Sequence, residues 1–165
     1  MKVLAIDPGY GRCGVAVVEK ENNPSTSLRA RKEVVLYSNC IETSAKDEFP
    51  ARLGVIVTEC TRLLKKHKPD AVALEKLFVT KNQKTAMRVS EVRGALISAA
   101  QQAGVPVFEY TPGEVKSAAA GFGGADKTAV VKMLHALVNI REDVRHDDEY
   151  DAIAVGITHL ARVRG

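Results

Sequence analysis

Acidic residues stand at positions in this chain where several carboxylates could act together. Asp7 ends the first apolar run of the sequence, and Glu75 ends a later one. Asp148 and Asp151 are three residues apart, so on a helix they would share one face. Carboxylate oxygens around one point suit hard cations such as Mg²⁺ and Mn²⁺. Two such ions ~3.5–4 Å apart can activate water and hold the leaving oxygen during phosphodiester cleavage.

Taken singly, each of these acids has an ordinary explanation. An Asp before Pro-Gly, as at position 7, is a common turn residue. Asp148 and Asp151 in the first turn of a helix would be stabilised by the helix dipole. Their joint placement favours a common site, because an acid at the end of a buried strand is costly to desolvate unless it is paired or bound to metal. Ligands of α/β sheets also gather beyond the carboxyl ends of strands.

Hydrophobic periodicity predicts the elements that must position these acids. Strands are predicted at residues 2–6, 14–19, 33–43, 71–75 and 105–110. Helices are predicted at residues 53–64, at 82–103, from Thr111 to near Gly121, from Asp126 to Val138, and from about Asp148 to Arg162. Thr111 and Glu114 form an expected capping box, and Asp126 is an expected cap. This order predicts an α/β fold, a mixed sheet covered by helices.

Composition and length narrow the class of protein. A chain of 165 residues is expected to form one domain, residues 1–165. Its 45% hydrophobic and 27% charged residues exclude a disordered chain. No apolar run approaches the ~20 residues of a membrane helix, and the early acid and glycine do not fit a signal peptide. The cytoplasm is the expected compartment, and a net charge of +4 fits a nucleic-acid partner without proving one.

The cysteines and histidines show no metal-ligand spacing. Cys13, Cys40 and Cys60 are widely spaced and form no CxxC or Cys/His pattern, so neither a disulfide framework nor a zinc site is expected. His146 could be a residue beside a helix cap or a ligand of the acidic site. The remaining histidines receive no role: His67, His135 and His159. Phosphate-loop, dinucleotide and serine-hydrolase motifs are also missing from the sequence.

Four segments, in order over nearly the whole chain, carry a more specific signal. They are Ala-Ile-Asp-Pro-Gly at 5–9, Ala-Leu-Glu-Lys-Leu-Phe-Val-Thr-Lys-Asn at 73–82, Val-Phe-Glu-Tyr at 107–110 and Asp-Glu-Tyr-Asp-Ala-Ile-Ala-Val at 148–155. Together they resemble the RuvC Holliday-junction resolvases. The resemblance implies an RNase H-like fold with a five-stranded mixed sheet flanked by helices. It also implies a homodimeric, metal-dependent endodeoxyribonuclease that nicks opposing strands of four-way junctions in recombination and repair.

The resemblance assigns the metal site by position. The family's four acids match Asp7, Glu75, Asp148 and Asp151. They would hold Mg²⁺, with Mn²⁺ as an alternative, as two ions in each active site. Asp147 competes with Asp148 for the third position, and His146 is a further candidate.

The resemblance also implies contacts to DNA. Lys116 and Lys127 match basic residues near the scissile phosphate, and Phe78 matches an aromatic that acts against bases at the junction. Without the family, these would be read as two solvated lysines and a core Phe. Further basic residues around this region are candidates for phosphate contacts: Lys76, Lys81, Lys84, Arg88 and Arg93. A RuvA–RuvB branch-migration complex is an implied partner.

Other classes of function compete with this one. A DNA-binding module that keeps the fold but cuts nothing is one alternative, although the presence of all four acids argues against it. An RNase H-like enzyme that acts on RNA or an RNA–DNA hybrid is another. An actin-like kinase shares the strand-Asp-Gly opening, but the chain is too short for its two lobes. The segment from Tyr10 to Gly14 and the long hairpin at 21–32 depart from expectation and leave DNA contacts at that edge open.

Overall fold

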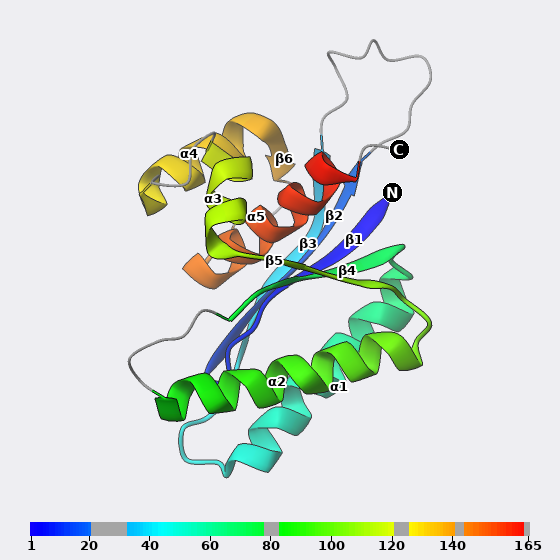
Figure 1. Cartoon of the computed structure of the whole chain (residues 1–165), viewed down its shortest axis with the longest axis vertical. Helices are drawn as coiled ribbons and strands as arrows, with labels where there is room; N and C mark the ends of the chain where they lie inside the picture. Colours follow the sequence, from blue (N-terminus) through cyan, green and yellow to red (C-terminus); the bar gives the residue numbers. More distant parts are fainter. Residues whose placement is uncertain (21–32, 78–82, 121–125, 141–143, 164–165) are drawn as a thin grey trace.

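The computed structural model describes residues 1–20, 33–77, 83–120, 126–140 and 144–163, and within them six strands form one mixed sheet (Figure 1). The strands are β1 (Lys2–Asp7), β2 (Arg12–Lys20), β3 (Glu33–Glu42), β4 (Ala71–Glu75), β5 (Val107–Tyr110) and β6 (Val138–Ile140). Their order across the sheet is β5-β4-β1-β2-β3-β6. β4 is parallel to both β1 and β5, β2 is antiparallel to β1 and β3, and β6 is parallel to β3.

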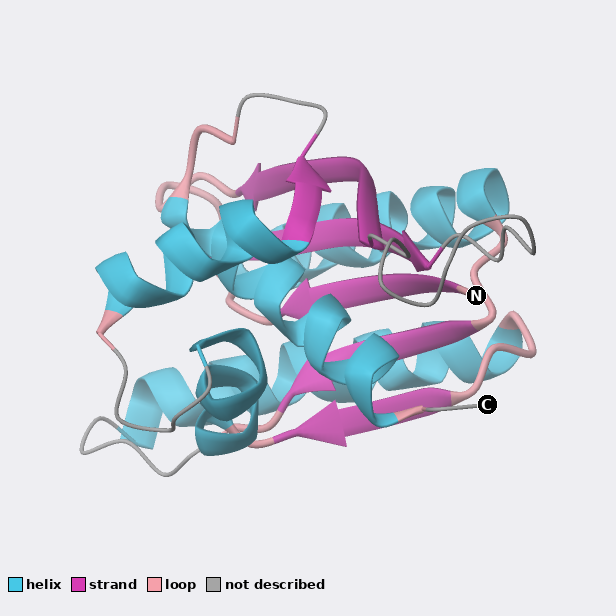
Figure 2. Ribbon diagram, turned by 90° about the horizontal axis from the view of Figure 1, so that it is seen from above, coloured by secondary structure: helices cyan, strands magenta, loops and turns pink. Residues whose placement is uncertain are grey.

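Helices cover both faces of this sheet (Figure 2). One face carries α1 (Phe49–His67) and α2 (Gln83–Gln102), and the other carries α3 (Pro112–Ala120), α4 (Lys127–Leu137) and α5 (Asp147–Arg162). Successive side chains of β1 point alternately to the helices on the two faces of the sheet. Leu4 packs with Ile56 of α1, whereas Ala5 packs with Ile153 of α5. Because both faces are covered, β1 and β4 are nearly continuous apolar runs rather than alternating ones.

The closest helix to the sheet is α5. Gly156 allows this approach, because a Cβ atom there would lie 2.8 Å from Cγ2 of Val18 and 3.2 Å from Cβ of Ala5. Residues 152–160 of α5 are all buried. The helix is thereby fixed in position along the sheet, which also fixes the acids of its first turn.

The α/β class and most of the predicted elements are confirmed. The Thr111 hydroxyl accepts a hydrogen bond from the Glu114 N–H at 3.2 Å, and the Glu114 carboxylate accepts one from the Thr111 N–H at 2.7 Å, as a capping box requires. Asp126 caps α4 by accepting from the N–H of Ala129 at 2.8 Å. None of the described helices combines the length and the apolar character that crossing a bilayer requires.

The predicted strand count of five is wrong by one among the described residues. Val138 was expected at the end of a helical stripe, but it begins β6 and pairs with Glu33 of β3. Val138 is 1% exposed, whereas Leu137 before it is 39% exposed. A short apolar run fits the periodicity of a helix and of a strand equally well. Here the residues from Val138 form a strand because they can pair with the edge of β3. The hairpin at 21–32 lies outside the described residues.

Candidate active site

Asp7 and Glu75 end two parallel strands that are neighbours in the sheet. The register pairs Ile6 of β1 with Leu74 of β4, so the next residue on each strand is an acid. Their carboxyl groups are close enough to hydrogen-bond to each other, and this contact contributes to the raised pKa of Asp7. The predicted convergence of the two strand ends is therefore confirmed.

The N-terminal end of α5 brings two more acids to this point, Asp148 in its first turn and Asp151 in its second. Gly14 of β2 pairs directly with Asp7, and a Cβ atom on Gly14 would lie only 1.9 Å from the carbonyl oxygen of Asp148. The absence of a side chain at Gly14 therefore lets the helix start descend onto the sheet. The negative charges of Asp148 and Asp151 both act on Asp7. Four carboxyl groups from three elements thus share one electrostatic environment.

The raised pKa values of these acids indicate that ionising all four carboxyl groups together is unfavourable when no cation is bound. Burial raises the pKa of Asp7 to about 8, with further contributions from the charges of Glu75, Asp151 and Asp148. Burial also raises the pKa of Glu75 and of Asp151, partly opposed by neighbouring lysines. Not all of these carboxyl groups carry a charge near neutral pH unless positive charge is supplied. An all-oxygen donor set of this kind fits Mg²⁺ or Mn²⁺.

Two lysines line the same site. Nζ of Lys127 lies 3.2 Å from Oδ2 of Asp151 and 3.3 Å from Oδ2 of Asp147. Desolvation lowers the pKa of Lys127, but these two carboxylates outweigh it and raise that pKa overall. Lys116 is exposed, and its charge lowers the pKa of Glu75. Both lysines line a hollow of about 270 Å³ together with Glu75 and Asp151.

The geometry distinguishes Asp148 from its neighbours. Asp147 is 76% exposed and pairs with Lys127, whereas Asp148 is 25% exposed and its charge acts on Asp7. His146, the N-cap residue of α5, has its side chain next to Cys40 and Glu42 of β3. Among the three candidates, the arrangement favours Asp148 for the third position of the acid cluster.

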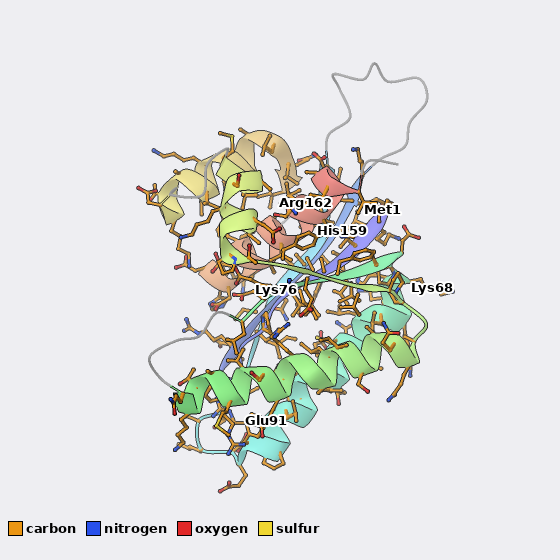
Figure 3. The ribbon with its side chains drawn as sticks, viewed as in Figure 1. Met1, Lys68, Lys76, Glu91, His159 and Arg162 are labelled. Atoms are coloured by element: carbon orange, nitrogen blue, oxygen red, sulfur yellow. The ribbon has the colours of Figure 1, made fainter. Side chains whose placement is uncertain are left out.

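One of the predicted DNA contacts, Lys76, lines a second hollow of about 300 Å³ together with Asp7, Glu75 and the start of α2. Lys76 follows directly after β4 (Figure 3) and is exposed, as is Lys84. Arg88 lies 4.1 Å from the Phe49 ring centroid and pairs with Glu91 at 3.0 Å.

Arg93 differs from the other basic candidates on α2. Its guanidinium is ion-paired with Glu109 of β5, and its side chain is only 18% exposed. Phe78 and Lys81 lie outside the described residues. DNA contact by any member of this set stays a prediction.

Sequence reasoning missed one buried acid. Glu149 is 5% exposed, and its carboxylate accepts a hydrogen bond from the Ser38 hydroxyl at 2.6 Å. It also accepts from the backbone N–H groups of Arg145 and His146, both at 3.1 Å. Glu149 therefore fastens the start of α5 to β3. The available signal was its place as the third helical residue after the cap, where an acid commonly binds free N–H groups.

Comparison with known proteins decides the family. A family model described as crossover junction endodeoxyribonuclease RuvC matches residues 3–159. The chain belongs to the RuvC family. RuvC of Halothermothrix orenii is 40% identical over 159 residues, which cover 96% of this chain and 92% of that protein.

Solved RuvC structures share the fold. The Thermus thermophilus RuvC structure matches with a TM-score of 0.87 and 34% identity, covering 99% of this chain and 96% of that one. The T. thermophilus RuvC in complex with a Holliday junction substrate matches with a TM-score of 0.86 and 34% identity, covering 97% and 93%. The predicted RNase H-like fold is therefore confirmed, and the acid cluster lies in a chain that matches RuvC over nearly its full length.

Proposed function

We propose that this RuvC-family chain is an endodeoxyribonuclease that resolves four-way DNA junctions by paired nicks in opposing strands, during recombination and repair. The observation that carries the proposal is the convergence of Asp7, Glu75, Asp148 and Asp151 at one end of the sheet. The Holliday junction bound in the T. thermophilus RuvC complex supports the choice of substrate. Residues 1–165 act in this proposal as one nuclease domain.

We propose Mg²⁺ as the cofactor, with Mn²⁺ as a substitute and two ions in each site. The four acids offer oxygen donors only, and the raised pKa of Asp7 marks a place where positive charge is lacking. Divalent ions held there would lower the pKa of a water molecule and stabilise negative charge on the leaving oxygen.

The chain's own residues take distinct parts in this proposal. Asp7, protonated below about pH 8, would lose its proton to solvent when cations bind, so that both Asp7 and Glu75 could serve as ligands. Asp148 and Asp151 complete the set from α5. Lys127, already 3.2 Å from Asp151, would stabilise charge on the phosphate, and Lys116, which lines the same hollow, would assist it.

The substrate is proposed to be recognised by shape. Exposed Lys76 lines the hollow beside Asp7, and exposed Lys84 directly precedes Thr85, which also lines it. Both suit contacts to the phosphate backbone, which position DNA without reading its sequence. A homodimer would place two such sites against the two strands that are cut. We further propose that the protein works in the cytoplasm and with a RuvA–RuvB branch-migration complex, both on the basis of family membership.

The deciding experiment compares cleavage of a labelled synthetic four-way junction with cleavage of linear duplex and of an RNA–DNA hybrid, in Mg²⁺ and in EDTA. We expect paired nicks in the junction with Mg²⁺, and junction binding without cleavage for Asp7→Asn. Junction binding with no product under any divalent metal would instead indicate a binding module. Preferred cleavage of the hybrid would indicate an RNase H-type activity.

A further inference from the structure

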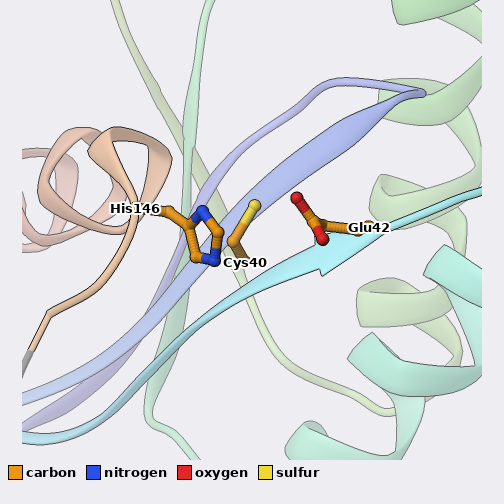
Figure 4. A group of neighbouring side chains, drawn as sticks. All are labelled: Cys40, Glu42 and His146. Atoms are coloured by element: carbon orange, nitrogen blue, oxygen red, sulfur yellow. The ribbon is translucent and has the colours of Figure 1, made fainter.

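Among the described residues, a second group of metal-ligating side chains lies beside the acid cluster. Cys40 and Glu42 are two residues apart on β3, so their side chains lie on the same side of the strand. His146 approaches them from the start of α5, and the three side chains point toward one another (Figure 4). One ligand atom from each lies within 4.8 Å of the other two.

The donor set differs in kind from that of the acid cluster. Thiol sulfur, imidazole nitrogen and a carboxylate oxygen are the ligands of zinc and related ions, whereas Mg²⁺ takes oxygen. In a tetrahedral zinc site, neighbouring ligand atoms stand roughly 3.3–3.7 Å apart. Side-chain rotations that draw the present atoms together by about one ångström would give this spacing. The sequence hid the group, because β3 and α5 are far apart in the chain and only the fold unites them.

The surroundings of the group allow an ion to enter. Cys40 is 7% exposed, His146 is partly buried and Glu42 is exposed. β6 pairs with β3 only at residues 33–35, so among the described strands none covers the outer edge of β3 at Cys40 and Glu42. Three protein ligands with an open side correspond to a zinc site that keeps an exchangeable position.

Arg12 supplies the positive charge at this place. Its Nε lies 3.3 Å from Oε1 of Glu42, and its NH1 group lies 4.0 Å from Oδ2 of Asp148. The side chain is 61% exposed, so it can move into solvent when another cation takes its place. The same arginine therefore marks the site as one that already attracts a cation.

We propose that Cys40, Glu42 and His146 bind a zinc-class divalent ion, and that this ion competes with the acid cluster for Asp148. Sγ of Cys40 lies 3.8 Å from Oδ2 of Asp148, so an ion on the sulfur is within reach of that carboxylate. Each Asp148 oxygen drawn to this ion is lost to the proposed Mg²⁺ site. The ion therefore weakens Mg²⁺ binding and inhibits cleavage; this second step rests on the proposed function.

Binding also moves a proton. Burial, aided by Asp148 and Glu42, raises the pKa of the Cys40 thiol to about 11. The thiol is protonated at neutral pH, and its proton passes to solvent as the sulfur–metal bond forms.

Binding is tested with Co²⁺ on the whole chain, under reducing conditions and without DNA. A thiolate-to-cobalt charge-transfer band should appear and should vanish on addition of Zn²⁺. Cys40→Ala should abolish the band, and His146→Gln should raise the half-saturating Co²⁺ concentration at least ~10-fold. Cys60→Ala and His135→Gln are the matched controls and should keep the wild-type curve, because neither residue belongs to the group. Arg12→Gln should lower the half-saturating concentration, since a competing cation is removed.

Two results would contradict the proposal that these three residues bind the ion. One is an unchanged band in Cys40→Ala. The other is loss of the band in Asp7→Asn, which would show that an ion on Cys40 is held through the acid cluster and not by the three proposed ligands.

The proposed competition between this site and the acid cluster is measured in a separate experiment, in which Mn²⁺ binding is compared with and without saturating Zn²⁺. Zn²⁺ should weaken Mn²⁺ binding at least ~5-fold in the wild type and not in Cys40→Ala. Equal effects of Zn²⁺ on both proteins would refute the coupling. A wild-type protein that binds Co²⁺ through Cys40 but never cuts junctions would refute the proposed function and leave this site standing.

Discussion

The carboxyl group of Asp7 meets that of Glu75 across the parallel strands β1 and β4. The two carboxyl groups are close enough to hydrogen-bond, and burial together with this neighbour raises the pKa of Asp7 to about 8. Two carboxyl groups at adjacent strand ends cannot both be charged cheaply in a partly buried place. The fold thus holds an unfavourable arrangement that either protonation or a bound cation relieves, and this has measurable consequences.

Replacing Asp7 should increase the stability of the fold and decrease the cleavage activity. Asp7→Asn removes a buried charge, so at pH 8 in EDTA the free energy of unfolding should rise by roughly 1–3 kcal/mol. Junction cleavage should fall at least ~100-fold, because a metal ligand is lost. Thermal unfolding and a cleavage assay check the two effects. Asp70→Asn is a control in cleavage, since Asp70 is exposed before the start of β4, at the end of the strand away from Glu75. A stability loss in Asp7→Asn would contradict the prediction.

The pH dependence of stability follows from the same group. The folded pKa of Asp7 lies above its unfolded value of 3.8, so the folded state holds this proton more tightly. This contribution to stability is full below about pH 4 and is lost as pH rises toward 8. In EDTA, wild-type stability should therefore decline across that window relative to Asp7→Asn. Saturating Mg²⁺ should remove the difference in slope, and calorimetry at several pH values measures it.

Mg²⁺ binding should strengthen with pH for the same reason. Below pH 8 the ion must displace the proton of Asp7, so the apparent affinity should rise up to about tenfold per pH unit. Isothermal titration between pH 6 and 8 gives the slope. A pH-independent affinity in the wild type would show that Asp7 does not exchange its proton for the ion.

Lys127 should affect cleavage more than stability. Its ion pairs with Asp147 and Asp151 are half-exposed, so Lys127→Ala should change the free energy of unfolding by less than ~1 kcal/mol. Cleavage should drop roughly 10–100-fold through lost stabilisation of phosphate charge, while Mg²⁺ affinity stays or increases because a competing cation is gone. Lys132→Ala, an exposed lysine on the same helix, is the matched control. Weakened Mg²⁺ binding in Lys127→Ala would argue against this division of roles.

The strand-end acids could be predicted from the sequence, and the helix acids only in part. Asp7 and Glu75 were identifiable because the carboxyl ends of parallel neighbours meet at one edge of a sheet. Asp147 and Asp148 both stand in the first turn of α5, so periodicity could not choose between them. The choice depends on how far α5 descends onto β2, which is a contact between distant segments. The grouping of Cys40 with His146 was hidden for the same reason.

Glu149 should stabilise the fold through its hydrogen bonds at the start of α5. Glu149→Ala leaves the Ser38 hydroxyl and the N–H groups of Arg145 and His146 without this acceptor, and we expect a loss of about 2–4 kcal/mol. Ser38→Ala removes one of these bonds and should cost about 1 kcal/mol. Chemical denaturation measures both. Equal losses in the two variants would mean that the backbone N–H groups find another acceptor.

Gly14 tests whether the close approach of α5 sets the position of Asp148. In Gly14→Ala the new Cβ would lie 1.9 Å from the Asp148 carbonyl oxygen, a separation that cannot persist, so the first turn of α5 must move away from Asp7. We expect a loss of roughly 1–3 kcal/mol in stability and a weaker affinity for Mg²⁺, because one carboxylate is withdrawn from the site. Gly54→Ala is the control, since its Cβ would stand in open space on α1 and should stabilise the helix by about 0.5–1 kcal/mol. Titration with Mg²⁺ at pH 8 distinguishes the outcomes: an unchanged affinity in a folded Gly14→Ala protein would mean that Asp148 does not need this register to serve the site.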